Sequence, residues 1–388
     1  MSAARWVRRG ALALVFGCPL AGLVIPARAT AQAPVARASA GVHFESYSFA
    51  APGVTGASSI SLLTVPFAAR VAVTHGLSIE AAGAYARATV SAFGTDLTLS
   101  GPTDVELRAT AAVQRGQTTV AFAGVGIVPS GHERLGLEEL VVAGAVASDL
   151  LPFHVSNWGT GGGAGGDLTI AQGFEGGSVG LSAGYRVASA FRPFHVVDLS
   201  YRPGNELRVG AGLERTLAGD QTVLLQLSYA RFGEDLWEGV NLFHTGARVL
   251  AMGGYTAPLG SGTASLYGGV LYRSGGALAE NLSWVGVLTG MEPPPSETLV
   301  LLGSSARLPW RSNVLVPSLD FRALRRSDGT GQGVLVGVGA AAELRLGGGA
   351  RLVPSARARL GRLLVSEGAA SGVRGFEVGL GLQLGGAR

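Results

Sequence analysis

One stretch, Thr103–Val128, alternates polar and apolar side chains through its first half. Because successive side chains of a β-strand point to opposite faces, one face would be charged and the other apolar. The charged face carries Asp104, Glu106 and Arg108, and the apolar face carries Val105, Leu107 and Ala109. The short break QRGQ then precedes a second run of small and apolar residues. We therefore predict a hairpin whose two faces lie in different environments.

The same alternation recurs along most of the chain, and the breaks between the predicted strands are of two kinds. Short breaks at 74–76, 114–117, 173–176, 218–220, 258–262, 309–313 and 347–349 alternate with longer ones at 51–58, 92–102, 129–161, 188–204, 233–240, 274–296, 326–332 and 364–373. Tight periplasmic turns alternating with longer outer loops are typical of outer-membrane barrels. The count predicts about 16 strands, with 14 as the alternative, and both chain ends in the periplasm.

The composition favours a membrane setting. Charged residues make up only 14% of the chain and hydrophobic residues 47%, whereas an ordinary soluble domain has roughly 25% charged residues. A strand in a bilayer must have all its backbone N–H and C=O groups paired, so a sheet there must close on itself. We predict an all-β fold, a transmembrane antiparallel up-and-down β-barrel. The alternative is a soluble antiparallel sandwich with one solvated face.

The N-terminus has the three parts of an export signal. Arg5, Arg8 and Arg9 precede an apolar run at 10–25, and Ala29-Thr30-Ala31 forms a small-residue cleavage site. We predict a cleaved signal peptide at 1–31, a short periplasmic segment at 32–40 and a single barrel domain at 41–388. Cys18, the only cysteine, lies inside the apolar run, which favours ordinary secretory export over attachment of a lipid.

Three segments carry a resemblance to a known family: SISLLTVPFAAR at 59–70, GPTDVELR at 101–108 and GTGGGAGG at 159–166. The chain resembles outer-membrane proteins of the long-chain fatty-acid channel superfamily, and most of all the branch linked to degradation of aromatic compounds such as phenol. The resemblance spans most of residues 40–385. It implies a monomeric barrel that passes small hydrophobic molecules, in some members through a lateral opening in the wall.

If the apolar faces meet lipid, the charged faces line the lumen. The candidates for lining a permeation path are Asp104, Glu106, Arg108, Glu206, Arg208, Asp320, Arg322, Arg345, Arg357 and Arg359. These charges either form a salt-bridged interior that stiffens the barrel or a constriction that selects permeants by charge. The last three arginines form the least balanced group, even with Glu343 neutralising one of them, and predict a patch that attracts anions.

The longest predicted loop contains a segment, 137–153, in which Leu137, Leu140, Val141 and Gly144 have helical spacing. We predict either an amphipathic helix folded into the mouth of the barrel or a strand extended above the membrane. An apolar groove at the mouth would be formed by Leu140, Val141, Phe153 and Trp158. Aromatic residues near strand ends are expected in the membrane-interface girdles; they are Tyr47, Trp158, Tyr201, Trp237, Trp284 and Trp310.

Other chemistries find little support in the sequence. The six histidines show no metal-ligand spacing, the glycine-rich run at 159–167 lacks a phosphate-loop lysine, and the net charge of +4 forms no basic patch for nucleic acid. We expect no cofactor and no metal. The predicted function is passive uptake of small, hydrophobic or aromatic molecules across a bacterial outer membrane. The alternatives are a closed-lumen structural or surface-binding barrel, and a barrel enzyme. The expected partners are outer-membrane lipid, the permeant and the barrel-assembly machinery, with the protein as a monomer.

Overall fold

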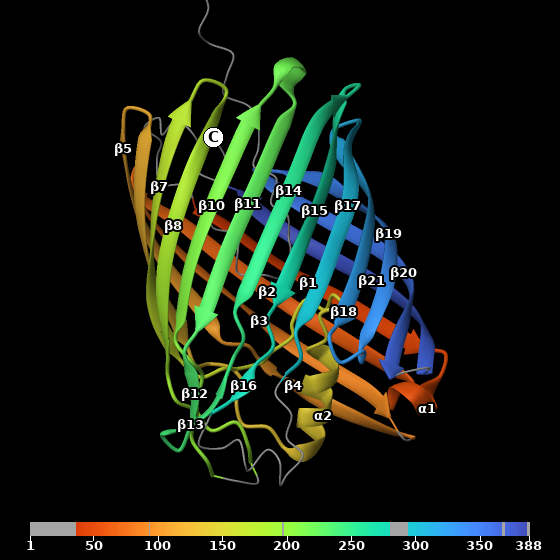
Figure 1. The fold of residues 1–388 in the computed structure, drawn as a ribbon. Helices are drawn as coiled ribbons and strands as arrows, with labels where there is room; N and C mark the ends of the chain where they lie inside the picture. Colours follow the sequence, from red (N-terminus) through yellow and green to blue (C-terminus); the bar gives the residue numbers. More distant parts are fainter. Residues whose placement is uncertain (1–35, 93, 196–197, 280–293, 367–368, 386–388) are drawn as a thin grey trace, which may run out of the picture.

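The computed structural model (Figure 1) describes residues 36–92, 94–195, 198–279, 294–366 and 369–385. The predicted signal peptide and its cleavage site therefore lie outside the described residues. The wall strands are β1 (Ala36–Phe49), β2 (Ser59–Thr74), β3 (Leu77–Ala92), β4 (Thr95–Pro102), β5 (Val105–Arg115), β6 (Thr118–Val128), β7 (Gly163–Phe174), β8 (Gly177–Ala188), β10 (Glu206–Thr216), β11 (Thr222–Phe232), β14 (Arg248–Leu259), β15 (Gly262–Arg273), β17 (Glu297–Trp310), β18 (Asn313–Arg326), β19 (Gln332–Gly347), β20 (Ala350–Ser366) and β21 (Ala369–Gly385).

These strands close into a single antiparallel barrel. The sheet contains 17 strands among the described residues, but β4 and β5 pair with successive halves of β3 and occupy one position in the ring. The ring therefore has 16 positions, which confirms the predicted barrel and excludes the 14-strand and sandwich alternatives. The first and last strands complete the wall, with Arg37 opposite Gly385 and Phe49 opposite Val373. β1 begins at Ala36, so the barrel includes residues that the sequence placed in a periplasmic segment.

The two ends of the barrel differ in the way the sequence predicts. One end carries tight turns, among them the 3-10 turn η1 (Ala218–Asp220). The other end, at the bottom of Figure 1, carries the longer connections, with helices α1 (Pro52–Thr55) and α2 (Leu137–Val146). A small four-stranded sheet also lies there, made of β9 (Tyr201–Arg202), β12 (Glu234–Trp237), β13 (Val240–His244) and β16 (Ala277–Leu278); we call it the loop sheet.

Most of one predicted loop is a strand of the barrel wall. Residues 92–102 were expected to form a loop, but β4 runs from Thr95 to Pro102 and pairs with the outer half of β3. The sequence pattern missed it because its apolar side chains, Leu97 and Leu99, face the interior and pack there, so this strand has no charged lumenal face. Among the described residues, no helix combines the length and apolar character needed to cross a membrane.

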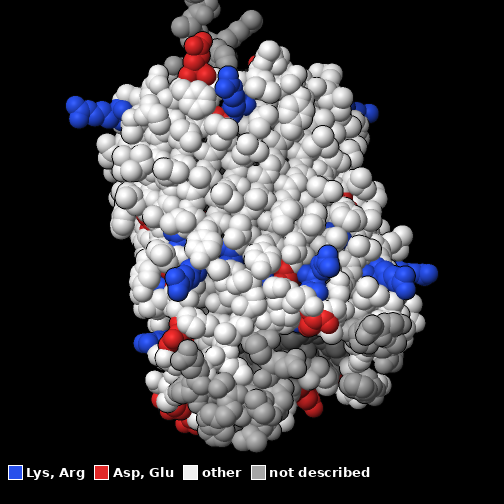
Figure 2. Space-filling model, in the orientation of Figure 1, with Lys and Arg blue, Asp and Glu red and all other residues white. Residues whose placement is uncertain are grey.

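The register gives the wall an apolar outer surface. On β5, Leu107 is exposed on the outside, whereas its neighbours Glu106 and Arg108 make ion pairs with lumen-facing residues of other strands. The same alternation continues around the ring, because residues opposite each other in an antiparallel pair share a face. Figure 2 shows the result on one side, a broad white band without charged side chains.

The aromatic girdles are built from residues other than most of those expected. Near the loop end, the outward-facing aromatics include Tyr85, Tyr185, Tyr229, Tyr272 and Phe376, and near the turn end they include Phe122, Phe174, Tyr255 and Trp310. Of the predicted set, Trp310 alone among the described residues lies on the outer wall. Tyr47 and Trp158 are buried inside the barrel, and Tyr201 and Trp237 belong to the loop sheet. Trp284 lies outside the described residues.

Two neighbouring positions on β7 test the assigned register. Leu168 is exposed on the outer wall, and Thr169 faces the lumen opposite Ala121. Leu168→Arg is expected to destabilise the bilayer-embedded barrel by about 2–4 kcal/mol, and Thr169→Arg by less than about 1 kcal/mol. The free energy of unfolding in lipid vesicles, measured by denaturant titration, checks this. Equal costs, or a larger cost at Thr169, would contradict the register.

Candidate functional site

The connection between β6 and β7, residues 129–162, folds back into the barrel. We call it the inserted segment. Val142, Val146, Leu150 and Leu151 are buried within one cluster that includes the inner faces of β1–β4, β17–β21 and the buried Trp158. The part of β3 beneath α2 is lined by small inward-facing residues, Ala84, Ala86 and Ala88. These short side chains leave the space that the segment occupies.

The predicted helix at the mouth is present as α2. Its first turn carries Glu138 and Glu139, which suit the positive end of the helix dipole, and Glu139 accepts a hydrogen bond of 2.8 Å from the Gly136 N–H. The packed face differs from the predicted one, because the wall receives Val142 and Val146. Leu137 and Val141 are instead 68% and 50% exposed.

One carboxylate holds both ends of the inserted segment. Asp104 lies in the break between β4 and β5, and its Oδ1 accepts a hydrogen bond of 3.0 Å from the Gly131 N–H. Its Oδ2 accepts bonds of 2.7 and 3.1 Å from the backbone N–H and hydroxyl of Thr160. The sequence placed this residue in the lumen as a permeation candidate. In the structure its hydrogen bonds position the segment.

The middle of the segment is also fixed to the wall. Trp158 Nε1 donates to the Ala86 carbonyl at 3.1 Å, and Arg322 Nη1 donates to the Asp149 carbonyl at 3.1 Å. The fully buried Glu45 accepts a hydrogen bond of 2.9 Å from the backbone N–H of His154. The His154 Nδ1 atom lies 3.0 Å from the same carboxylate oxygen.

Beside this attachment lies a network that we call the buried charge cluster: Tyr47, Asp320, Arg357, Arg359 and Glu377. Arg359 is 3% exposed, and its guanidinium lies 3.0 Å from Glu377 Oε2 and donates to the Tyr47 hydroxyl at 2.9 Å. Arg357 Nε lies 3.2 Å from Asp320 Oδ1. Buried charges in such a setting are stable only when paired and hydrogen-bonded.

Glycines make room for these long side chains. Gly337 and Gly339 on β19 lie opposite Arg359 and Arg357 on β20. A Cβ on Gly337 would lie 2.6 Å from Asp320 Oδ1, so any side chain there would displace the carboxylate that pairs with Arg357. The glycines opposite Arg357 and Arg359 therefore leave room for the cluster at this level of the barrel.

The predicted anion patch is not assembled. Arg357 and Arg359 are paired with Asp320 and Glu377, so their charge is balanced. Arg345 lies opposite Arg351 near the tight-turn end, roughly 20 Å along β19 from the cluster at 3.3 Å per residue. The carboxylate of Glu343, which was expected to neutralise this group, instead binds Arg307 through bonds of 2.6 and 2.8 Å and lies 3.5 Å from Arg351.

The remaining charged candidates are also paired. Arg108 contacts Asp167 at 2.5 Å, Arg186 lies 3.9 Å from Glu106, and Arg208 contacts Glu206 on the same strand at 2.5 Å. The predicted groove does not form as one surface. Trp158 is 2% exposed, and the half-buried Phe153 packs edge-on against Tyr47, at 5.1 Å between ring centroids. Leu140 is half-buried as well, and Val141 alone of the four is exposed.

Two clusters of potential metal ligands come together in the described residues, His43–His154–Glu377 and His132–Glu139–His195. Residue spacing could not reveal the first cluster, because its members lie on β1, the inserted segment and β21. Its geometry suits stacking better than coordination. The two imidazole rings lie 4.4 Å apart with 25° between their planes, and Glu377 already binds Arg359. A cation there would also face the nearby guanidinium groups.

The opposite side of the lumen has a different lining. The inward-facing residues of β6, β7, β8, β10 and β11 include many small ones: Thr119, Ala121, Ala123, Thr169, Ala171, Ser178, Gly180, Ser182, Gly210, Gly212 and Ser228. The ion-paired Asp167, Arg186, Glu206 and Arg208 face the lumen on the same strands. Barrels of about 16–18 strands are too wide for wall side chains to fill. The inserted segment therefore occupies one side, and the small-residue wall borders the space on the other.

No family model matches the chain, and no curated protein does. The resemblance to the fatty-acid channel superfamily therefore stays a prediction. Among solved structures, an outer membrane channel from Pseudomonas putida F1 aligns with 11% identity over 93% of this chain and 99% of that one, with a TM-score of 0.38. The translocator domain of the autotransporter NalP from Neisseria meningitidis aligns with 13% identity, 89% and 87% coverage and a TM-score of 0.32. These likenesses are too distant to assign a function.

Removing one member of the buried charge cluster should be costly. Arg359→Gln leaves Glu377 buried without its closest cation, and we expect a loss of about 3–5 kcal/mol in the free energy of unfolding. The matched control is Arg345→Gln, an exposed arginine whose loss should cost less than about 0.5 kcal/mol. Denaturant titration of both variants in vesicles measures this. Equal small losses would show that the cluster contributes little.

The attachment of the inserted segment at His154 should depend on pH. Burial opposes protonation of His154, and so does the positive charge of Arg359. The hydrogen bond and negative charge of Glu45, together with the charge of Glu377, outweigh these two effects, so the pKa of His154 is raised above 6.5. His43 stacks on the same ring. The stabilisation from protonated His154 is complete below its pKa in the unfolded state and is lost as the pH rises through its pKa in the folded state.

Amide hydrogen exchange of residues 147–158, corrected for intrinsic rates and followed from about pH 6 to about pH 9, measures this effect. Protection should fall with rising pH by roughly 1 kcal/mol. His154→Gln should show reduced protection and no such transition. The same transition in His154→Gln would assign it to another group.

Proposed function

We propose that the protein is a bacterial outer-membrane channel for passive uptake of small molecules that are hydrophobic or aromatic. The observation that carries the proposal is the asymmetry of the lumen. The inserted segment is fixed against one side by Asp104, Glu45 and Trp158, and the opposite wall carries small residues such as Ser182 and Gly212. A wide barrel with one side occupied retains a path along the other.

The apolar character of the mouth supports a hydrophobic permeant. Leu137 and Val141 of α2 are exposed there. A cavity of about 350 Å³ lies between α2 and the wall, within the usual size range for small-molecule sites. Its lining includes Phe49, Ile60, Leu151, Leu324 and Leu363 together with Arg273, Glu297 and Arg326.

The balance of lumenal charge supports an uncharged permeant. Arg108, Arg208, Arg357 and Arg359 each have an acidic partner. Paired charges create little net field along a path, so strong selection for ions of one sign is not expected. These residues then act chiefly as structural supports of the lumen. The permeant, outer-membrane lipid and the assembly machinery are the proposed partners of a monomeric barrel that reaches the membrane after signal-peptide cleavage.

The alternative is a structural or surface-binding barrel with a closed lumen, and the extensive buried contacts of Val142, Val146 and Leu150 favour it. The two functions differ in permeation. The barrel reconstituted in a planar bilayer should show single-channel conductance, and liposomes that contain it should take up a small aromatic solute such as phenol faster than empty ones. Absence of both would favour the closed-lumen alternative.

The role of the mouth can be tested separately. Leu137→Ser with Val141→Ser removes apolar surface worth about 1 kcal/mol and should lower uptake of the aromatic solute roughly fivefold. Glu138→Gln, on the same helical turn, is the matched control and should leave uptake unchanged. Ion conductance should be the same in all three proteins. Unchanged uptake in the double variant would show that α2 does not contribute to permeation.

A further inference from the structure

Two connections meet at the loop end of the barrel, beside the start of α2. Leu135, in the inserted segment, forms a parallel bridge with Phe194, in the chain that follows β8. The Leu135 N–H donates to the Pro193 carbonyl at 2.9 Å, and the His195 N–H donates to the Leu135 carbonyl at 3.0 Å. These two backbone hydrogen bonds fix His195 beside the inserted segment.

Three side chains that can ligate a metal converge at this junction. His132 precedes α2, Glu139 belongs to its first turn, and His195 is brought in by the bridge. One ligand atom from each residue lies within 4.8 Å of the other two. The expectation of no metal rested on spacing along the chain, and spacing cannot show a group that is assembled by a contact between two connections.

The contact between His132 and Glu139 suits a metal better than a hydrogen bond. His132 Nε2 lies 3.4 Å from Glu139 Oε1, and this nitrogen is buried without a hydrogen-bond partner among the described residues. Two ligand atoms that are each about 2.1 Å from a tetrahedral zinc ion lie about 3.4 Å apart. The observed separation therefore matches one edge of a zinc coordination shell.

The surrounding contacts orient both of these ligands. Glu139 Oε2 accepts a hydrogen bond of 2.8 Å from the Gly136 N–H, which leaves Oε1 to face the histidine. Carboxylates that bind metals are commonly held by such hydrogen bonds. The His132 side chain packs over Gly101, where an added Cβ would lie 2.9 Å from the His132 Cβ. His195 is exposed, so its ring is free to turn and complete the set.

The charges around the junction leave the carboxylate available to a cation. Arg134 and Arg192 lie close in sequence to the two histidines, and each is 3.3 Å from Asp198 Oδ1. Within the described part of the chain, the ion pair that Glu139 makes is with His132. In the other cluster of potential ligands, by contrast, the carboxylate is already bound to an arginine.

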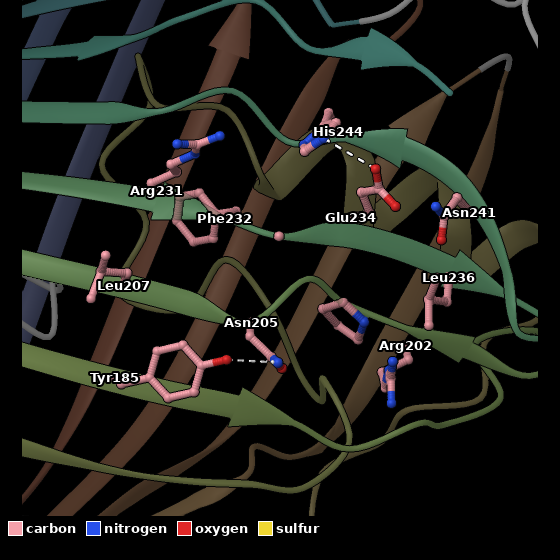
Figure 3. Close-up of a pocket in the computed structure, with 12 residues that line it drawn as sticks. Tyr185, Arg202, Asn205, Leu207, Arg231, Phe232, Glu234, Leu236, Asn241 and His244 are labelled. Carbon is pink, nitrogen blue, oxygen red and sulfur yellow. Dashed lines mark hydrogen bonds and ion pairs between the residues drawn. The ribbon is translucent and has the colours of Figure 1, made fainter. Parts of the chain in front are cut away.

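A second histidine–glutamate contact, at the loop sheet, shows what a pair without a third ligand looks like. His244 Nε2 lies 3.4 Å from Glu234 Oε1 at the edge of a pocket of about 520 Å³ (Figure 3). The other polar side chains that line this pocket are arginines, asparagines and a tyrosine, which are not usual zinc ligands. The distance alone therefore does not identify a site. The third ligand and the buried Nε2 of His132 do.

We propose that His132, Glu139 and His195 bind a divalent transition-metal ion, for which Zn²⁺ is the best fit. Two imidazole nitrogens and one carboxylate oxygen suit zinc, whereas Ca²⁺ and Mg²⁺ take oxygen ligands. A water molecule would complete the tetrahedron. The ion would join the chain that follows β8 to the first turn of α2 and hold this part of the barrel mouth in one arrangement. The site does not depend on which solute passes through the lumen.

Zinc titration of the intact barrel tests the site directly. The protein is purified in neutral detergent without a polyhistidine tag, stripped with EDTA and titrated with Zn²⁺ by calorimetry. The wild type should bind one ion, and His132→Gln and His195→Gln should each weaken its binding by about tenfold or more. The matched control is His244→Gln, which removes a histidine with the same 3.4 Å glutamate contact and should bind zinc like the wild type.

Two further measurements separate metal binding from a loss of structure. Glu139→Gln keeps an oxygen that can accept the Gly136 N–H, so α2 should remain folded while zinc affinity falls. Amide hydrogen exchange of residues 132–140 and 189–195 should slow when zinc is added to the wild type, and should not change when it is added to His195→Gln. Heat-modifiable gel migration confirms that each variant is a folded barrel.

Four results would overturn the proposal. The first is no zinc binding by the wild type, and the second is wild-type affinity in both His132→Gln and His195→Gln. The third is loss of the bound ion in His154→Gln alone, which would assign it to the cluster on β1 and β21. The fourth is displacement of the ion by an equal concentration of Mg²⁺, which would show a site without preference for nitrogen ligands.

Discussion

The rest of the structure depends on the pairing of every backbone N–H and C=O group in the wall. In lipid no water satisfies these groups, so the sheet must close, and it closes where β1 runs antiparallel to β21 from Arg37–Gly385 to Phe49–Val373. Closure fixes the register of all 16 positions. The register in turn sends one set of alternating residues to lipid and the other to the lumen, where charged side chains remain hydrated or paired.

Closure also brings together residues that are distant in the chain. Tyr47 and Glu377 meet Arg359 because the first strand lies beside the last. Together with Glu45 and His154, these residues form a rigid support for the inserted segment on one side of the lumen. The opposite wall, with small residues on β6–β11, needs no such support. One barrel thus combines a packed half, which resembles a protein core, with a lining suited to passage.

Much of this architecture could be predicted from period-two alternation and from the order of tight turns and longer loops. The strand β4 escaped prediction because Leu97 and Leu99 pack against α2 and neighbouring residues, so the expected charged face is missing. The inward placement of Asp104, Arg357 and Arg359 followed from the pattern. Their partners could not be predicted in the same way, because pairing depends on the register between strands. Arg357 and Arg359 contact Asp320 and Glu377. Arg345 is separated from this group by its position along β19.

The central claim is that a solvent-filled path runs along the small-residue wall. The most direct measurement is conductance during modification of a single introduced cysteine, which is feasible because Cys18, the chain's only cysteine, lies in the predicted signal peptide. Ser182→Cys on β8 faces the lumen and Leu181→Cys faces lipid. A bulky, charged methanethiosulfonate reagent should reduce the current through Ser182→Cys and leave Leu181→Cys unchanged. Full current after complete labelling of Ser182→Cys, or no labelling at that position, would contradict a path along this wall.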